Sequence, residues 1–375
     1  VRANAAAGRI LRGSDLMAGR ATVRSLCGDF NQALGDEIWD VIGGGAERQP
    51  DDTDFAAADG GWIAIRRTIR PAGASGESRG ALLIIEDATE QRRMRSLLEK
   101  TMSPGVARSW LAAPREELGG ELREATILFA DIRGFTSLAE SLGPHAVVDL
   151  LNRYFTYMAD VIGAEGGTID KFVGDGILAL FGVPTSHGDD ADRAVAAARD
   201  MLRALSLLNA EPGFPQLKIG IGIATGPVIA GRIGSPDRMN YTVIGNAANL
   251  AARIEGVCKS YGCPILACDE TVRRLRRPAT TRLIDIVFVE GQETRTPIHE
   301  IFVETSGTDA PWLTPFAAGV SAYLAGEFAT AQLHFAEAGA IKADDPITRV
   351  LVQRCRELER QRPSDWTGAW KLREK

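Results

Sequence analysis

Between residues 122 and 305, short apolar runs rich in β-branched residues alternate with amphipathic helical patterns, and this alternation limits the possible folds most strongly. Two of the expected strands, 168–173 and 176–181, are separated only by Gly174 and Asp175, which indicates a local hairpin. Hairpins join antiparallel strands, whereas strands joined through helices can lie parallel. We therefore expect an α+β unit with a mixed, mostly antiparallel sheet.

Further elements of this unit follow from the same two periodicities. Strands are predicted at 124–131, 217–233 and 241–244, and helices at 144–164, 189–209 and 245–256. The glycine-rich run 220–226 falls inside a predicted strand, and no helical pattern follows its glycines. We therefore do not interpret it as a dinucleotide-binding loop, which requires a helix directly after the glycines.

The chain has 375 residues, more than one domain usually holds, so several units are expected. Residues 1–87 are interpreted as a first domain and 88–121 as a signalling helix and linker. The main unit follows at 122–305, and 311–375 is interpreted as a small helical tail.

The first domain resembles a PAS sensor domain of α/β type. The resemblance rests on Asn4-Ala5-Ala6, on two strand-like runs at 62–70 and 80–85, and on the exit segment Asp87-Ala88-Thr89-Glu90. Because the first histidine of the chain is His145, a histidine-ligated haem is excluded in this domain. We favour a ligand-free dimerisation module.

The tail contains a helix-turn-helix pattern that resembles one tetratricopeptide repeat. The pattern consists of aromatic and small residues: Phe316, Tyr323, Gly326, Phe328, Ala331, Phe335 and Ala338. A single repeat cannot bury its own apolar face, so we expect it to pack on the main unit or on a partner chain. The aromatic segment 366–370 is either the docking point or an exposed end.

Composition excludes several classes of protein. The formal net charge of -6 argues against a nucleic-acid partner. The five cysteines are odd in number and scattered, so no disulfide framework or zinc site is expected, and Cys258, Cys263 and Cys268 are interpreted as small buried residues. No apolar run is long enough for a membrane helix and no signal peptide opens the sequence, which predicts a cytoplasmic protein. The sequence opens on Val1 instead of methionine, so further residues are expected upstream.

Two segments place carboxylates where a metal could bind. In Phe129-Ala-Asp131-Ile-Arg-Gly134, a strand delivers an aspartate directly before a glycine-containing turn into a helix, beside free backbone N–H groups. In Lys171-Phe-Val-Gly174-Asp175-Gly176, a hairpin tip exposes a second aspartate. Two carboxylates that a fold brings together repel each other unless a cation neutralises them. Taken alone, each segment is better explained as an ordinary turn.

A third segment, Tyr241 to Arg253, supplies groups suited to a nucleotide. Asn249 and Arg253 are four residues apart on a predicted helix and so share one face. An amide can orient a ribose and a guanidinium can hold a phosphate. Helix capping and a surface arginine explain this segment equally well when it is taken alone.

Taken together and in this order, the three segments strongly resemble the class III nucleotidyl cyclase domain over residues 122–305. The resemblance implies a ferredoxin-like fold and a homodimer with active sites at the subunit interface. It implies that Asp131 and Asp175, with the carbonyl of Ile132, bind two Mg²⁺ ions per site, for which Mn²⁺ can substitute.

The same resemblance assigns the substrate contacts. Lys171 and Thr242 would read the adenine of ATP, because an ammonium can donate to adenine N1, where guanine presents a donor. Asn249 would position the ribose and Arg253 would stabilise charge at the α-phosphate. A further implied contact with the substrate is made by the turn after the first strand: Gly134, Phe135 and Thr136.

The expected activity is that of an adenylate cyclase regulated through the first domain. A guanylate cyclase and a catalytically silent, protein-binding relative remain alternatives. One departure favours the silent alternative: the family usually has a lysine that touches the triphosphate in a Val-Lys-Gly-Lys type segment, and this chain reads Val289-Glu290-Gly291-Gln292. Arg295 is a candidate to replace that lysine.

Overall fold

The computed structural model divides into two compact units, Val1–Thr101 and Met102–Lys375. The residues that it describes are 5–10, 22, 32–43, 46–56, 62–72, 80–94, 106, 119–235, 238–277, 279–288, 295–303, 310–361 and 366–371.

The first unit contains a three-stranded antiparallel sheet with the order β1-β2-β3. Its elements are α1 (Ala5–Ile10), α4 (Gln32–Ile42), β1 (Arg48–Ala56), β2 (Trp62–Pro71) and β3 (Ala81–Asp87). Leu34, Ile38 and Val41 recur on one face of α4 and are buried with residues of β2 such as Ile65 and Ile69. The antiparallel pairing of β2 with β3 confirms the predicted hairpin.

A nine-stranded sheet forms the centre of the second unit, with the order β12-β10-β11-β9-β7-β4-β6-β5 and with β8 paired to β7. The strands are β4 (Gly119–Ile132), β5 (Thr168–Val173), β6 (Gly176–Phe181), β7 (Ile219–Ser235), β8 (Arg238–Ile244), β9 (Ile265–Cys268), β10 (Thr281–Phe288), β11 (Arg295–Ile301) and β12 (Trp370–Lys371). Only the β7–β9 and β10–β12 pairs are parallel among the described strands. The predicted mixed, mostly antiparallel sheet is therefore confirmed.

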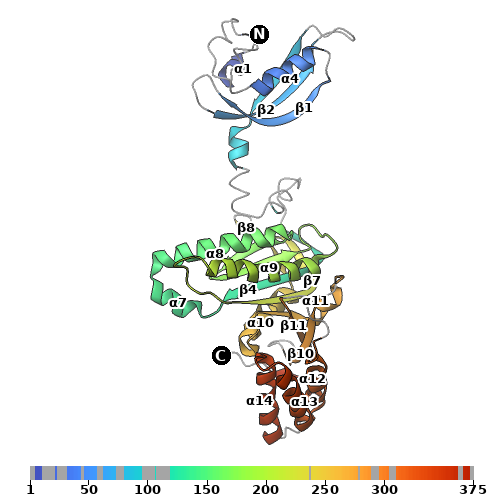
Figure 1. Cartoon of the computed structure of the whole chain (residues 1–375). Coiled ribbons are helices and arrows are strands. Elements are labelled where there is room, and N and C mark those ends of the chain that lie inside the picture. The colour runs from blue at the N-terminus through green and yellow to red at the C-terminus, as the bar shows by residue number, and fades with distance from the viewer. Residues whose placement is uncertain are drawn as a thin grey trace. The chain divides into compact units, whose positions relative to one another are not determined.

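Helices cover both faces of this sheet (Figure 1). They are α7 (Phe135–Leu142), α8 (Pro144–Ala164), α9 (Asp190–Asn209), α10 (Asn246–Tyr261), α11 (Asp269–Arg274), α12 (Leu313–Ala325), α13 (Phe328–Ile341) and α14 (Pro346–Gln361). Along β4, Leu128 packs with the α8 and α9 core, whereas Ile127 packs with the core that includes α10 and α12–α14. This alternation is the period of two expected for a strand buried on both faces.

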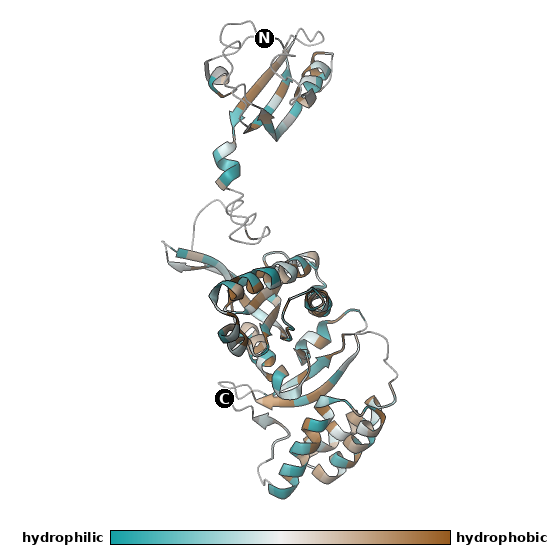
Figure 2. Ribbon diagram, turned by 60° about the vertical axis from the view of Figure 1, so that its left-hand side comes forward, coloured by the Kyte–Doolittle hydropathy of each residue, from teal (hydrophilic) through white to brown (hydrophobic). Residues whose placement is uncertain are grey.

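The ribbons of this unit carry the corresponding hydropathy pattern. Figure 2 shows hydrophobic and hydrophilic residues interleaved along the helices, as amphipathic helices require. On α8 the buried residues are Leu150, Tyr154, Met158 and Ile162, spaced four apart along one face. This face holds α8 against the sheet and brings Tyr154 towards the ends of β4 and β6.

Close approach of α10 to the sheet depends on one glycine of β7. A Cβ atom on Gly222 would lie 2.1 Å from the carbonyl oxygen of Ala251 and 2.3 Å from the backbone nitrogen of Glu255. Only glycine leaves room for the α10 backbone at this distance. The glycine-rich run thus lies in a strand, as predicted, and Gly222 allows the close approach of α10.

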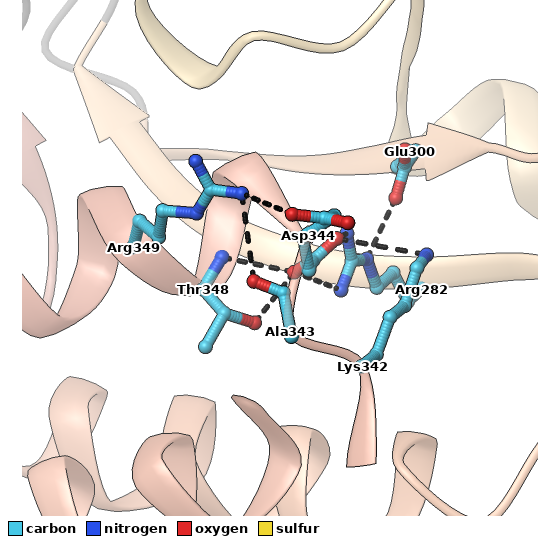
Figure 3. Close-up of polar contacts among 8 residues, drawn as sticks. Arg282, Glu300, Lys342, Ala343, Asp344, Thr348 and Arg349 are labelled. Atoms are coloured by element: carbon cyan, nitrogen blue, oxygen red, sulfur yellow. Dashed lines mark hydrogen bonds and ion pairs between the residues drawn. The ribbon is translucent and has the colours of Figure 1, made fainter. Parts of the chain in front are cut away.

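The C-terminal helices pack on the main sheet within the same compact unit, around the buried side chain of Arg282 on β10 (Figure 3). Its guanidinium donates two hydrogen bonds to Asp345, at 2.9 and 2.6 Å, and one to Glu300 at 2.7 Å. It also lies 4.2 Å from the ring centre of Phe316 on α12. Asp345 in turn accepts a hydrogen bond of 2.9 Å from the Thr348 backbone in the first turn of α14.

A second arginine crosses the same interface in the opposite direction. Arg354 of α14 donates to Asp285 of β10 and, at 3.0 Å, to the hydroxyl of Tyr261 at the end of α10. Its guanidinium lies 4.1 Å from the ring centre of Trp370 in β12. Trp366 contacts Tyr323 at a ring separation of 5.2 Å. Of the two alternatives for segment 366–370, docking is therefore the one observed.

Candidate active site

Asp131 and Asp175 come together at one end of the sheet. Asp131 is the penultimate residue of β4, and Asp175 lies in the turn between β5 and β6, which pairs with β4. The Ile132 backbone N–H donates to Asp175 Oδ2 at 3.3 Å. Gly174 has a φ of 63°, in the left-handed region that a two-residue hairpin turn requires. Local turn chemistry therefore presents Asp175 to the end of β4.

The electrostatics of this pair are unfavourable in the protein alone. Burial, followed by the negative charge of Asp175, raises the pKa of Asp131 to about 7. The fully buried hydroxyl of Tyr154 has no hydrogen-bond partner among the described residues. Burial first, and then the charges of Asp131 and Asp175, raise the pKa of Tyr154. Among the described residues, no cation forms an ion pair with either aspartate to relieve this negative charge.

Arg133 and Glu255 form an ion pair beside the aspartates. Arg133 Nη1 lies 3.0 Å from Glu255 Oε1, and Nη2 donates to the Glu255 carbonyl at 3.3 Å. Burial raises the pKa of Glu255, and the Arg133 charge opposes this rise. Sequence patterns assigned no role to Arg133 or Glu255, although the position of Glu255 on the buried face of α10 is a signal from which it could have been found.

Lys171 and Thr242 lie together, 71 positions apart in the chain. Lys171 Nζ donates to Thr242 Oγ1 at 3.2 Å. Sequence reasoning missed a third member, Asp170, which accepts a hydrogen bond of 2.9 Å from Thr242 and lies 3.1 Å from Lys171 Nζ. Burial raises the pKa of Asp170, while Thr242 and Lys171 oppose the rise.

Asn249 and Arg253 lie on another side of α10 from the residues that contact β7. Asn249 is exposed and Arg253 is half-buried, whereas Ala251 and Glu255 are buried against the strand. Within one chain, therefore, it is Glu255 that faces the two aspartates.

The turn after β4 opens α7 beside Asp131. Gly134 precedes this helix, and Phe135 and Thr136 are its first two residues. The N-cap residue Gly134 provides no side-chain cap, so the first backbone N–H groups of α7 can donate hydrogen bonds to an anion. Arg295 opens β11 and is exposed, and segment 289–294 lies outside the described residues.

The donor set fits a hard divalent cation. Asp131, Asp175 and the Ile132 carbonyl offer oxygen ligands, which Mg²⁺ prefers. Within the described ranges no cluster of three or more His, Cys, Asp or Glu side chains could hold a metal by itself. Mg²⁺ commonly completes its coordination with water and substrate phosphates, so two carboxylates suffice. A cation here would also relieve the repulsion that raises the pKa of Asp131.

Comparison with known proteins agrees with this geometry. Residues 120–303 match the family described as adenylate and guanylate cyclase catalytic domain. The chain is 42% identical over 189 residues to an adenylate cyclase of Anabaena cylindrica, which covers 48% of this chain and 37% of that protein.

Two solved structures are also similar. A bacterial light-regulated adenylyl cyclase is 27% identical with a TM-score of 0.51, covering 58% of this chain and 64% of the other. The guanylyl cyclase Cya2 is 44% identical with a TM-score of 0.45, covering 49% of this chain and 94% of the other.

The chain therefore contains a class III nucleotidyl cyclase catalytic domain. Domains of this family bind a nucleotide, generally use divalent metals and function as dimers. This chain spans 37% of the length of the Anabaena relative, so the match concerns the catalytic domain. Among the described helices, none is long and apolar enough to cross a membrane.

Proposed function

We propose that this chain converts ATP to 3′,5′-cyclic AMP and pyrophosphate as a homodimer. The observation that carries the proposal is the meeting of Asp131 and Asp175 at the end of the sheet, with the Ile132 N–H 3.3 Å from Asp175 Oδ2. The choice of ATP is supported by the contact of Lys171 with Thr242. The Anabaena relative, named an adenylate cyclase, also supports it.

Asp131, Asp175 and the Ile132 carbonyl would hold two Mg²⁺ ions. Bound Mg²⁺ lowers the pKa of the ribose 3′-hydroxyl and neutralises charge on the phosphates. The 3′-oxygen attacks the α-phosphorus in line, and pyrophosphate leaves. The backbone N–H groups of Phe135 and Thr136, which follow Gly134 at the start of α7, would donate to the phosphates.

The base and the ribose are bound by groups that we assign to the other subunit. Lys171 donates to adenine N1 and Thr242 accepts from the 6-amino group. Asn249 orients the ribose, and Arg253 stabilises the charge that develops at the α-phosphate. The outward position of Asn249 on α10 supports a site shared between two chains. The first unit would act as the regulatory sensor and the C-terminal helices as part of the catalytic body.

A coupled pyrophosphate assay tests this function. Purified protein is incubated with ATP or GTP in the presence of Mg²⁺ or Mn²⁺, and the cyclic nucleotide is identified by mass spectrometry. We expect cyclic AMP from ATP. Turnover of GTP in preference to ATP would contradict the assignment of the base contacts, and turnover of neither nucleotide at high protein concentration would contradict the enzyme.

A silent, nucleotide-binding regulator is the second candidate. It is favoured by Glu290, which stands where the family usually carries a triphosphate-binding lysine, because a carboxylate would repel the phosphates. The retained pair Asp131 and Asp175 favours the enzyme instead. If ATP stabilises the protein but is not consumed, the protein is better explained as a regulator. In that case Glu290→Lys should create turnover.

A further inference from the structure

Asp170 occupies an irregular position in β5 that places it beside its own neighbour, Lys171. In a regular strand, successive side chains point to opposite faces. Here Ile169 pairs with Ala179, and Lys171 pairs with the adjacent Leu178. Strand β5 therefore contains one extra residue, Asp170, between these two pairs. This is a β-bulge, a feature that redirects side chains. It explains how residues 170 and 171 both reach Thr242.

The three side chains form a closed set of contacts. Thr242 Oγ1 donates to Asp170 Oδ2 at 2.9 Å, and Lys171 Nζ lies 3.1 Å from the same oxygen. Lys171 Nζ also donates to Thr242 Oγ1 at 3.2 Å. The Asp170 side chain is 1% exposed, and no described residue donates to its other oxygen, Oδ1. Asp170 therefore contacts Lys171 and Thr242 from the interior of the protein and cannot itself reach a base that these two residues bind.

Counting hydrogens shows what this arrangement leaves free. A threonine hydroxyl has one hydrogen to donate and two lone pairs. In Thr242 the hydrogen is used by Asp170 and one lone pair by Lys171, so only an acceptor remains. The Lys171 ammonium has three hydrogens, two of which face Thr242 and Asp170, so it retains a donor. The pair thus presents one acceptor and one donor side by side.

We propose that Asp170 is a positioning residue for base selection, which fixes the Thr242 hydroxyl as an acceptor and so restricts the site to bases that pair an amino group with a ring acceptor. This inference rests on the proposed nucleotide cyclase function and extends it. Adenine matches through its 6-amino group and N1. Guanine and hypoxanthine present O6 and N1–H, which oppose the pair at both positions unless the base shifts along its edge.

A simpler role for Asp170 predicts a different result. If Asp170 only anchors the Lys171 ammonium or supports the fold of β5, its loss should weaken every nucleotide to a similar degree. If it sets the direction of the Thr242 hydroxyl, its loss lets that hydroxyl rotate and donate to O6. Discrimination between bases then falls while binding of the shared ribose and triphosphate is kept. The ratio between two nucleotides therefore separates the two roles.

ATP and inosine triphosphate form the sharpest pair of substrates, because they differ only at the edge that Lys171 and Thr242 read. The experiment measures kcat/KM for both nucleotides with wild type, Asp170→Ala and Thr242→Val. We expect Asp170→Ala to lower the ATP-to-ITP ratio about tenfold, the worth of one well-placed hydrogen bond. The double variant Asp170→Ala/Thr242→Val should have the same ATP-to-ITP ratio as Thr242→Val alone, because Asp170 acts through Thr242. Asp200→Ala, a carboxylate of a surface ion pair on α9, should leave the ratio unchanged.

An unchanged ratio in an active Asp170→Ala would overturn the proposal and leave the cyclase function standing. If wild type consumes no nucleotide, the proposed function fails, and the ratio of ATP to ITP dissociation constants, measured by competition with a fluorescent nucleotide, decides the role of Asp170 in the same way. If Asp170→Ala does not fold, Asp170→Ser, whose hydroxyl is too short to reach Thr242, gives the same readout.

Discussion

Two regions of the second unit concentrate charged side chains, and they do so in opposite ways. Where the C-terminal helices pack on β10, the buried Arg282 and Arg354 each face a carboxylate, Asp345 and Asp285 respectively. At the end of β4, two carboxylates face each other instead, and burial together with that repulsion raises the pKa of Asp131 to about 7.

The difference distinguishes a structural interface from a binding site. Opposite charges that satisfy each other need no further partner and hold two elements in one geometry. Like charges that the fold brings together lower its stability, and they form a binding site for a cation that neutralises them. Tyr154, whose buried hydroxyl has no hydrogen-bond partner in the described part of the chain, belongs to the second region. The interface should therefore fail by unfolding when it is mutated, and the site should fail by losing activity.

The largest effect on turnover is expected for Asp131→Ala. Removal of one metal-binding carboxylate should lower turnover roughly a hundredfold or more, a loss of about 3 kcal/mol of transition-state stabilisation. The circular dichroism spectrum should stay unchanged, because Asp131 forms no ion pair with any residue that the structure describes. Asp200→Ala, in an exposed pair on α9, serves as the control and should retain activity. Activity in Asp131→Ala would overturn the metal assignment.

Arg354→Met tests the interface. Of the described side chains, it leaves only Tyr261 as a partner for the fully buried Asp285, and it should cost about 3–5 kcal/mol of stability. The measurement is the urea midpoint of the transition that includes the main sheet. The surface variant Arg203→Ala should change the free energy of unfolding by less than about 1 kcal/mol. Combining Arg354→Met with Asp285→Asn should recover part of the loss, and equal midpoints for Arg354→Met and wild type would show that the pair is dispensable.

A smaller effect, of opposite sign, is expected for the stability of Asp131→Asn without metal. The folded-state pKa of Asp131, about 7, lies above its ordinary value of 3.8, so the folded protein retains a proton that the unfolded chain releases. This contribution is complete below about pH 4 and is lost as the pH rises through about 7.

The asparagine variant lacks that titration. In chelator, the Tm of wild type should therefore fall relative to Asp131→Asn between about pH 5 and about pH 8, by less than about 4 °C because the site is half open to solvent. Added Mg²⁺ should restore the wild type and not the variant. Parallel Tm curves over this pH range would show that the pKa of Asp131 is not raised in the folded protein.

Sequence patterns predicted the elements that local rules control. Helix α8 runs from Pro144 to Ala164 as expected, because a proline starts it and its apolar residues keep one period throughout. The hairpin of β5 and β6 also matches its predicted bounds, because glycines fix its turn. Lys171 and Thr242, which the resemblance assigns to the same base, are in contact.

Elements that depend on distant contacts were predicted less well. Strand β4 begins at Gly119, five residues before the predicted start, because pairing with β7 extends it through exposed residues. Helix α10 continues to Tyr261 instead of ending at residue 256, since the C-terminal helices bury that tyrosine. Asp170 was missed because a regular strand would turn it away from Thr242, and only the bulge brings it back.

Subunit complementation tests the shared site most directly. Asp131→Ala and Arg253→Ala are each expected to be inactive, because one loses the metal-binding group and the other the phosphate-binding group. In a mixed dimer, one of the two sites regains a complete set of groups, with Asp131 from one chain and Arg253 from the other. We predict that mixing the two inactive proteins restores partial cyclic AMP formation. No recovery in any mixture, despite proven exchange of subunits, would contradict an active site built from two chains.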